Sequence, residues 1–500
     1  MKSILWAVLL LTSISLSAQS GSHACGVNHE MDAQIKKRLL DNRDWAAQNV
    51  VNRMDEIYVP LNFWRVGFDD GTGKIRITDI LDQLCKLNED YSDTRFIFYL
   101  NNILELDNEN AFLEPTSYGA FLNSQKNNDG DDGINIFVCQ NAGTGGIGTT
   151  LGYYSPNFDF IVMRKQELPG PSSGTLTHEL GHFLSLPHPF FGWEGLPYDP
   201  DVHGNPCTVT SAERVDGSNC AFAGDGICDT PPDYLFAFSP MSCVAGCNFE
   251  CEVYDINNDQ IFPHEENVMS YFAPCAVYSF TTDQKNAMYS DFASPSRNYI
   301  RNDFVPDTNS VATNWVVNSP TVAEKFDNYN SVLFDWDDLE NASHYLVTIS
   351  GSSNHEIIVE QSELFMTSLV PNGFYTFGVR AYNQVSACSV FTPMSNLIFT
   401  TGDLETSISD IEEVEDIVIY PNPASNNSEV IIAIDLNERV DISTSLISMT
   451  QSHVLNVTNT KFEQGTNYMK IDLNNYPSGI YLLKFNLGSQ QITKRLVITN

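Results

Sequence analysis

Three histidines and one glutamate lie close together in the segment 178–188, as His178, Glu179, His182 and His188. Residues four apart share one face of a helix, so His178 and His182 can reach one ion while Glu179 stands beside it. Zinc in hydrolases takes three protein ligands and keeps one position for water, and His188 supplies the third ligand. We therefore predict a zinc site on the three histidines, with a chance grouping as the alternative.

The same segment resembles the H-E-x-x-H-x-x-G-x-x-H pattern of the metzincin peptidases, except that Ser185 replaces the glycine. That glycine ends the helix, and a non-glycine residue at positive φ is disfavoured by about 1 kcal/mol. Pro187 compensates, because it biases Leu186 away from helical geometry and cannot continue the helix itself. We expect the helix to break just before His188.

The segment Asn267 to Tyr271 resembles the Met-turn of the same clan. The resemblance places Met269 beneath the zinc ligands, whereas alone it would be ascribed to core packing. It also implies that Tyr271 hydrogen-bonds the developing oxyanion. Glu179 would be the general base, activating a zinc-bound water for attack on a peptide carbonyl and later passing a proton to the leaving amine.

Further motifs make the domain most similar to the pappalysin-like peptidases, the M43 or cytophagalysin family. They are Ile80 to Gln83, Leu87 to Tyr91, Leu151 to Tyr153, Thr175 to Thr177, Gly224 to Gly226, Asp229 to Pro231, Phe280 with Thr281, and Gln284. Family members often carry an acidic residue after the Met-turn tyrosine that favours basic side chains after the cut bond. The segment 272–278 has no acidic residue, so we do not expect that preference here.

Acidic runs suggest calcium as a second ion, which this family often binds in the same domain. The candidate ligands are Asp225 and Asp229, and the alternating oxygens of Asp255, Asn257 and Asp259. The last three resemble a calcium loop without its glycine and terminal glutamate. A turn rich in Asn and Asp explains them equally well.

Cys25 precedes Gly26 in the short segment before the first expected strand. Its thiolate could fill the fourth zinc position and keep a precursor inactive, as some pappalysin-like precursors are thought to do with a Cys-Gly pair. The N-terminus predicts export, and an exported protein is expected to form disulfides. Because the chain has 11 Cys, an odd number, at least one thiol is unpaired. A disulfide from Cys25 is the alternative.

Apolar and β-branched runs predict strands at 57–66, 95–100, 134–139 and 158–163. Helical spacing occurs over 80–87, and a second helix is expected from Gly174 onward. The fold class is thus multidomain, beginning with an α/β metzincin catalytic domain (a zincin) over 56–306.

Two smaller all-β domains are expected to follow. Residues 319–402, with short strands around Trp336 and the segment Leu369 to Ala381, resemble a fibronectin type III β-sandwich with Tyr375 as its tyrosine corner. An acidic linker over 403–416 precedes residues 417–500, which resemble the C-terminal sorting domain of type IX secretion. That resemblance implies a Gram-negative host, the type IX machinery as a partner, and a location outside the cell or on the outer-membrane surface.

Composition narrows the functional classes. A net charge of −37 disfavours nucleic acid and acidic lipids as partners, and 42% hydrophobic residues support folded cores. Residues 1–18 read as a signal peptide and 19–55 as a short propeptide-like segment. No later stretch is apolar for long enough to predict a transmembrane helix.

These features predict a secreted zinc-dependent endopeptidase that acts on protein or peptide substrates. One alternative is a cell-surface adhesin or binding protein with a catalytically weak zincin domain, which only Ser185 favours. Another alternative is a non-proteolytic zinc hydrolase.

Overall fold

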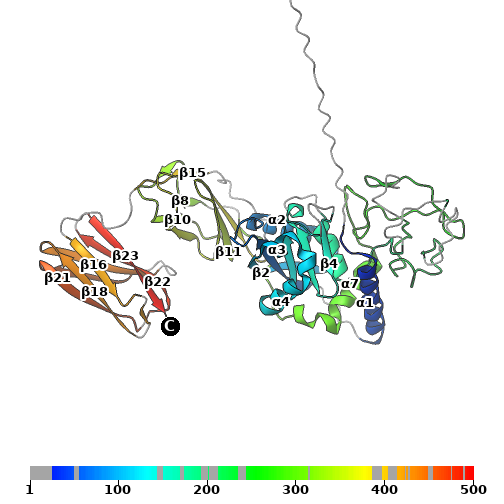
Figure 1. Ribbon diagram of the computed structural model, residues 1–500, viewed down its shortest axis with the longest axis horizontal. Helices are drawn as coiled ribbons and strands as arrows, with labels where there is room; N and C mark the ends of the chain where they lie inside the picture. Colours follow the sequence, from blue (N-terminus) through cyan, green and yellow to red (C-terminus); the bar gives the residue numbers. More distant parts are fainter. Residues whose placement is uncertain are drawn as a thin grey trace, which may run out of the picture. The chain divides into compact units, whose positions relative to one another are not determined.

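The structure is a computed structural model whose described part falls into two compact units, residues 1–310 with 383–388 and residues 311–382 with 389–500 (Figure 1). The expected signal peptide and residues 404–413 of the expected linker lie outside the described residues. The described ranges are 25–49, 56–143, 150–168, 174–192, 201, 212–234, 244–312, 316–385, 397–403, 414–422, 424–425, 428–448, 454–474, 476–487 and 490–499.

The first unit is built on a five-stranded sheet in the order β2-β1-β3-β5-β4. Its strands are β1 (Ile57–Gly67), β2 (Phe96–Asp107), β3 (Ile134–Cys139), β4 (Gly152–Ser155) and β5 (Phe160–Arg164). All neighbours are parallel except β4, which pairs antiparallel to β5 and forms one edge. Every residue of β3 is buried, as expected for a parallel strand covered on both faces. The four predicted strands are confirmed, and β4 was not predicted.

Helices cover the faces of this sheet (Figure 1). The predicted helices are α2 (Ile77–Asp90), whose apolar residues Ile80, Leu84 and Leu87 are fully buried, and α5 (Thr175–Phe183). The other helical elements are α3 (Glu109–Leu113), η1 (Pro115–Tyr118), α4 (Gly119–Asp129), η2 (Lys165–Glu167), α7 (Thr282–Ala293) and η3 (Pro295–Ile300), with a small hairpin of β6 (Val244–Ala245) and β7 (Asn248–Phe249).

Helix α1 (His29–Gln48) occupies most of the segment expected to be propeptide-like. Asn28 caps it by accepting a hydrogen bond from the Met31 backbone, and Ile35 and Leu39 are buried. The Lys36 ammonium donates to the Gly224 carbonyl oxygen at 2.7 Å. The helix therefore packs onto the rest of the first unit through both apolar and polar contacts.

The second unit begins with a β-sandwich that has its own core of Trp336, Phe334, Phe377 and Phe399. The Val370 backbone N–H donates to the Tyr375 hydroxyl at 2.7 Å, which is the contact a tyrosine corner makes. Its two sheets, β13-β10-β8 and β12-β11-β14-β15-β9, consist of β8 (Val317–Ser319), β9 (Glu324–Lys325), β10 (Val332–Trp336), β11 (His344–Gly351), β12 (His355–Val359), β13 (Glu363–Met366), β14 (Phe374–Tyr382) and β15 (Leu397–Thr400).

The C-terminal part is also all-β and has a separate core. Strand β16 begins at Val414, so the linker prediction was wrong for residues 414–416, where Val414 is buried among apolar residues. The sheets, β16-β18-β21 and β17-β23-β22-β19-β20, consist of β16 (Val414–Tyr420), β17 (Ala424–Ser425), β18 (Glu429–Leu436), β19 (Val440–Ser448), β20 (Val454–Phe462), β21 (Gly465–Asp472), β22 (Gly479–Leu487) and β23 (Gln490–Thr499).

Disulfides are present, as export predicted. Cys220 bonds to Cys228 and Cys247 to Cys275, and Cys85 and Cys251 are also disulfide-bonded. Within the described ranges the free thiols are Cys25 and Cys139.

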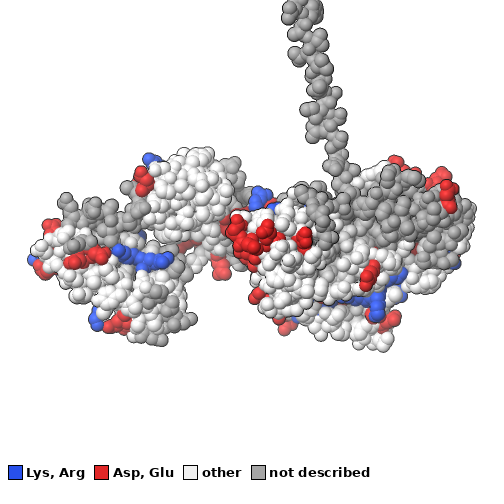
Figure 2. Space-filling view, in the orientation of Figure 1, with Lys and Arg blue, Asp and Glu red and all other residues white. Residues whose placement is uncertain are grey.

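The surface carries the excess acid of the sequence. Figure 2 shows red acidic side chains gathered on part of the first unit, with fewer blue basic ones on the same face. Among the described helices, none is both long enough and apolar enough to cross a bilayer.

Candidate metal centre

Helix α5 carries two of the three predicted ligands, and every residue of the helix is buried. His178, Glu179 and His182 are at most 7% exposed, and so is His188, which follows the end of the helix. The ring planes of His178 and His182 are perpendicular, with centroids 4.6 Å apart. One turn of helix thus places both imidazoles side by side, as the four-residue spacing predicted.

Each of the three rings is held through its Nδ1 atom. His178 Nδ1 lies 2.8 Å from the Val268 carbonyl oxygen, and His182 Nδ1 lies 2.7 Å from that of Leu186. His188 Nδ1 lies 2.7 Å from Asp32 Oδ2. All three partners are acceptors, so each Nδ1 carries the proton and each Nε2 presents its lone pair. This tautomer is the one that binds a metal through Nε2.

The Nε2 atoms converge on one point together with a sulfur. Ligand atoms of Cys25, His178, His182 and His188 all lie within 4.8 Å of one another. His182 Nε2 and His188 Nε2 are 3.1 Å apart, where two unshared lone pairs repel unless a cation lies between them. Tetrahedral zinc spaces nitrogen and sulfur ligands about 3.3–3.8 Å apart. The donor types therefore fit zinc, and the 3.1 Å nitrogen pair lies just below the spacing of zinc-bound ligands.

His182 is also in the protonation state that a metal needs. Burial lowers the pKa of His182, and the neighbouring rings of His188 and His178 lower it further. A neutral imidazole at physiological pH is ready to coordinate, because no proton has to leave first.

The Cys25 segment docks against the edge strand of the sheet. Gly26 N–H donates to the Gly152 carbonyl oxygen at 2.7 Å, and Cys25 forms a parallel bridge with Gly152. A Cβ at Gly26 would stand 2.7 Å from the Thr150 side chain, which would have to move to admit a larger residue. Burial and then the Glu179 carboxylate raise the pKa of the Cys25 thiol. A cation at the histidines is what would let this thiol ionise.

Glu179 is fully buried beside this cluster. Burial raises its pKa to about 8, and the Cys25 thiol and the Tyr154 backbone offset only part of that shift. A carboxyl group with a pKa in this range can both accept and release a proton near neutral pH.

Met269 packs directly against helix α5. Its side chain is fully buried, and a Cβ added at Gly181 would overlap its sulfur. The turn is fixed because Asn267 Oδ1 accepts from the Met269 backbone at 2.9 Å, and the Asn267 amide pairs with that of Gln284. Gln284 also forms a capping box with Thr281 at the start of α7. The turn carbonyl of Val268 in turn orients His178.

Tyr271 faces the same centre. Its hydroxyl lies 3.1 Å from His188 Nε2, and its ring is in contact with those of His188 and Phe190. Burial raises the pKa of Tyr271, so the phenol keeps its proton and can donate a hydrogen bond.

Two carboxylates near the centre were missed by the sequence reasoning. Asp32 of α1 holds His188, 156 residues further along the chain, and nothing in its local sequence marks it for that contact. A pocket opens beside the histidine cluster, and Asp90, at the end of α2, lines it together with Thr177, His178 and Tyr278. Its Oδ2 accepts from the Thr177 hydroxyl at 2.5 Å, and its Oδ1 pairs with Lys86.

The calcium candidates differ in the hydrogen bonds that their carboxylate oxygens accept. Asp229 caps α7 by accepting from the Thr281 hydroxyl and the Asp283 backbone. Asp255 Oδ1 accepts from the backbones of Asn257 and Asp259, which is the geometry of an Asx turn.

Asp225 differs from the other candidates because it is fully buried near a second carboxyl group, Glu213. Burial raises the pKa of Asp225 to about 8, and burial together with Asp225 raises that of Glu213 to about 9. The nearby Lys36 ammonium offsets part of both pKa shifts.

Comparison with known proteins gives two family matches. Residues 155–293 match the Peptidase M43 model, described as pregnancy-associated plasma protein-A, and residues 418–499 match the secretion system C-terminal sorting domain. An extracellular metalloprotease of Arthroderma gypseum is 26% identical over 232 residues, which cover 43% of this chain and 68% of that protein.

Solved structures give only weak overall likenesses. Dimeric latent PorU from Porphyromonas gingivalis is 13% identical with a TM-score of 0.16, covering 39% of this chain and 20% of that one. A DUF3244 protein from Bacteroides vulgatus with an immunoglobulin-like β-sandwich has 14% identity and a TM-score of 0.13, covering 17% and 97%. The FN1–FN3 domains of chicken CNTN1 are 11% identical with a TM-score of 0.14, covering 36% of this chain and 64% of that one. Scores this low carry no argument.

The sheet, the histidine cluster and the family matches define a metalloprotease domain. More particularly, the chain carries an M43, pappalysin-like domain followed by a β-sandwich and a type IX sorting domain. The sorting domain assigns the protein to the outside of the cell or to its surface. The predicted family and fold class are confirmed.

The packing of Met269 under Gly181 yields a prediction whose sign opposes helix propensity. Gly→Ala inside a helix ordinarily stabilises by about 0.5–1 kcal/mol. Gly181→Ala should instead destabilise by about 1–3 kcal/mol, because the new methyl group overlaps the Met269 sulfur. Gly174→Ala at the N-cap of the same helix is the comparison, since no atom lies within 4 Å of its Cβ position and only the modest cost of alanine at a cap is expected. Urea unfolding of the full chain measures both, and a Gly181→Ala variant as stable as the control would contradict the packing.

Proposed function

We propose that this chain is a secreted zinc endopeptidase whose zinc ligands are His178, His182 and His188, and that Cys25 keeps its precursor latent. The observation that carries the proposal is the convergence of three Nε2 lone pairs and one thiol, with every Nδ1 already engaged. The M43 match supports peptide bonds as the substrate.

In this proposal, bound zinc supplies a Lewis acid that lowers the pKa of water and polarises the peptide carbonyl. Glu179 takes the proton from the attacking water and delivers it to the leaving amine nitrogen. Tyr271 donates its phenolic hydrogen to the oxygen of the tetrahedral intermediate. Burial of both side chains keeps their charges and dipoles effective, because little water competes with them.

The edge strand β4 would bind the substrate main chain. The Gly152 carbonyl oxygen already accepts a hydrogen bond from Gly26, which shows that this edge takes an extended segment. The Cys25 segment thus occupies both the edge strand and the fourth ligand position. Cleavage that releases it would free both together.

The rival proposal of a catalytically weak zincin domain depended on Ser185. Ser185 nevertheless adopts φ +71° and makes the turn toward His188, so the substitution does not displace the third histidine. Hydrolysis of a casein or peptide substrate distinguishes the peptidase from a non-proteolytic hydrolase.

Glu179→Ala should keep the metal and lose hydrolysis, because it removes the proposed base and leaves the three ligands in place. We expect peptide cleavage to fall by about 10²–10⁴-fold. Zinc content and hydrolysis of a casein or peptide substrate are measured after activation, with the exposed Glu89→Ala variant as control. Equal cleavage by Glu179→Ala and wild type would refute the assignment.

Cys25→Ala should make the unprocessed chain active, because the fourth ligand position becomes free for water. A loss of only 1.4 kcal/mol in segment binding would raise activity about tenfold. Cys139→Ala is the matched control, since Cys139 is the other free thiol in the described ranges and is buried in β3. If Cys25→Ala is no more active than wild type, or if peptide mapping finds Cys25 in a disulfide, the latency proposal fails.

Cleavage-site mapping by mass spectrometry should show no strong excess of Arg or Lys after the cut bond. The pocket offers the apolar walls of Val268 and Phe272, and the charge of Asp90 is already paired with Lys86. A strong basic preference that disappears in Asp90→Asn would show that Asp90 attracts the substrate despite this pairing.

A further inference from the structure

The metal-binding helix ends in a turn that glycine usually makes. Ser185 N–H donates to the His182 carbonyl oxygen at 3.0 Å, and Leu186 N–H donates to that of Gly181 at 2.9 Å. These two bonds define a Schellman motif, in which the residue at the position of Ser185 is left-handed. Ser185 has φ +71°, a conformation that its side chain disfavours.

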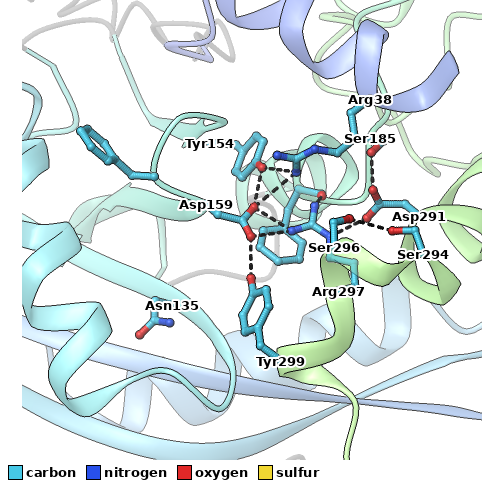
Figure 3. A network of polar contacts seen from close by, with 12 residues as sticks. Arg38, Asn135, Tyr154, Asp159, Ser185, Asp291, Ser294, Ser296, Arg297 and Tyr299 are labelled. Atoms are coloured by element: carbon cyan, nitrogen blue, oxygen red, sulfur yellow. Dashed lines mark hydrogen bonds and ion pairs between the residues drawn. The ribbon is translucent and has the colours of Figure 1, made fainter. Parts of the chain in front are cut away.

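The Ser185 side chain makes a contact that a glycine at this position could not make. It is 1% exposed, and its hydroxyl donates to Asp291 Oδ1 at 2.5 Å. The same oxygen accepts from Asn42 of α1 at 2.7 Å, and Asp291 Oδ2 accepts from Arg297 Nε at 2.7 Å. The hydroxyl therefore enters a buried network that joins α1, α7 and η3 (Figure 3).

Arg297 holds the other side of the same turn. Its guanidinium donates to the Phe183 carbonyl oxygen, lies 3.8 Å from the centroid of the Phe183 ring, and pairs with Asp159 at 2.7 Å. Although burial opposes it, Arg297 and Arg38 hold the pKa of Asp159 below its ordinary value. The network therefore contacts the turn at two residues, the Phe183 carbonyl oxygen and the Ser185 hydroxyl.

Both flanking zinc ligands depend on this turn. The Leu186 carbonyl oxygen, one residue after Ser185, accepts from His182 Nδ1 at 2.7 Å and orients that ring. His188 follows three residues after Ser185, and its Nε2 lies 3.1 Å from His182 Nε2. A change in the turn would move one ligand and rotate the other.

We propose that Ser185 is a positioning residue whose hydroxyl, bound to Asp291, holds the left-handed turn that a glycine would form unaided, and so sets the zinc affinity through His182 and His188. The inference rests on the proposed zinc peptidase function. It assigns a compensating role to the one position where the zinc motif departs from its pattern.

Two variants separate the hydroxyl from the backbone strain. Ser185→Ala keeps the strain and removes the hydrogen bond, whereas Ser185→Gly removes both. Ser294→Ala is the matched control, because it removes a buried hydroxyl that contacts Ser296 at the start of η3 and no metal ligand. Zinc affinity of the full chain is measured by competition with a chelator, and the unfolding of each metal-free variant is followed in urea.

We expect Ser185→Ala to bind zinc about tenfold more weakly, the lower end of the effect of losing support around a metal ligand. Ser185→Gly should bind zinc as wild type does, and so should Ser294→Ala. A merely structural role would lower the stability of Ser185→Ala and Ser294→Ala alike without separating their zinc affinities.

Two results would overturn the inference: a Ser185→Ala affinity equal to wild type, or a Ser185→Gly affinity as weak as that of Ser185→Ala. If Ser185→Ala does not fold, Asp291→Asn, which weakens the same hydrogen bond, takes its place: weaker zinc binding supports the inference, and wild-type affinity overturns it. A wild-type chain that binds no zinc would refute the proposed function and this inference together. A wild-type chain that binds zinc and cuts peptides, with no difference among the variants, would refute only the inference.

Discussion

The three Nδ1 hydrogen bonds are the contacts on which the rest of the centre depends. They come from three separate segments, because Val268 belongs to the Met-turn, Leu186 to the turn after α5, and Asp32 to α1. Each bond fixes one tautomer and one ring orientation, so that the Nε2 atoms meet at one point. The metal centre is therefore only as well ordered as these three segments.

Each segment is in turn held by polar contacts across the fold. Asn267 and Gln284 tie the Met-turn to α7, and Ser185 with Asp291 ties the second turn to α7 and α1. Helix α1 is anchored by Lys36, whose ammonium binds the Gly224 carbonyl oxygen. Because α1 also follows directly on Cys25, cleavage beyond α1 would remove Asp32, the partner of His188, together with the thiol.

Local sequence predicted what local geometry determines. The spacing of His178 and His182 placed both on one helix face, and apolar runs located β1, β3 and β10. Asp32 and Asp291 could not be found in this way, since their partners His188 and Ser185 lie 156 and 106 residues distant in the sequence. The turn at Ser185 was expected to rely on Pro187, whereas the structure shows the serine itself in the left-handed conformation. The acidic composition around 414–416 favoured a linker, but these residues begin a strand. The strand forms because Val414 packs into a core whose other residues lie on strands distant in the sequence.

X-ray absorption at the zinc edge of the full, unprocessed chain tests the central claim most directly. The account predicts one zinc per chain with three nitrogen ligands at about 2.0–2.1 Å and one sulfur at about 2.3 Å. It further predicts that the sulfur is lost, and an oxygen gained, once the segment bearing Cys25 is removed. A chain without zinc, or a zinc with fewer than three nitrogen ligands, would contradict the account.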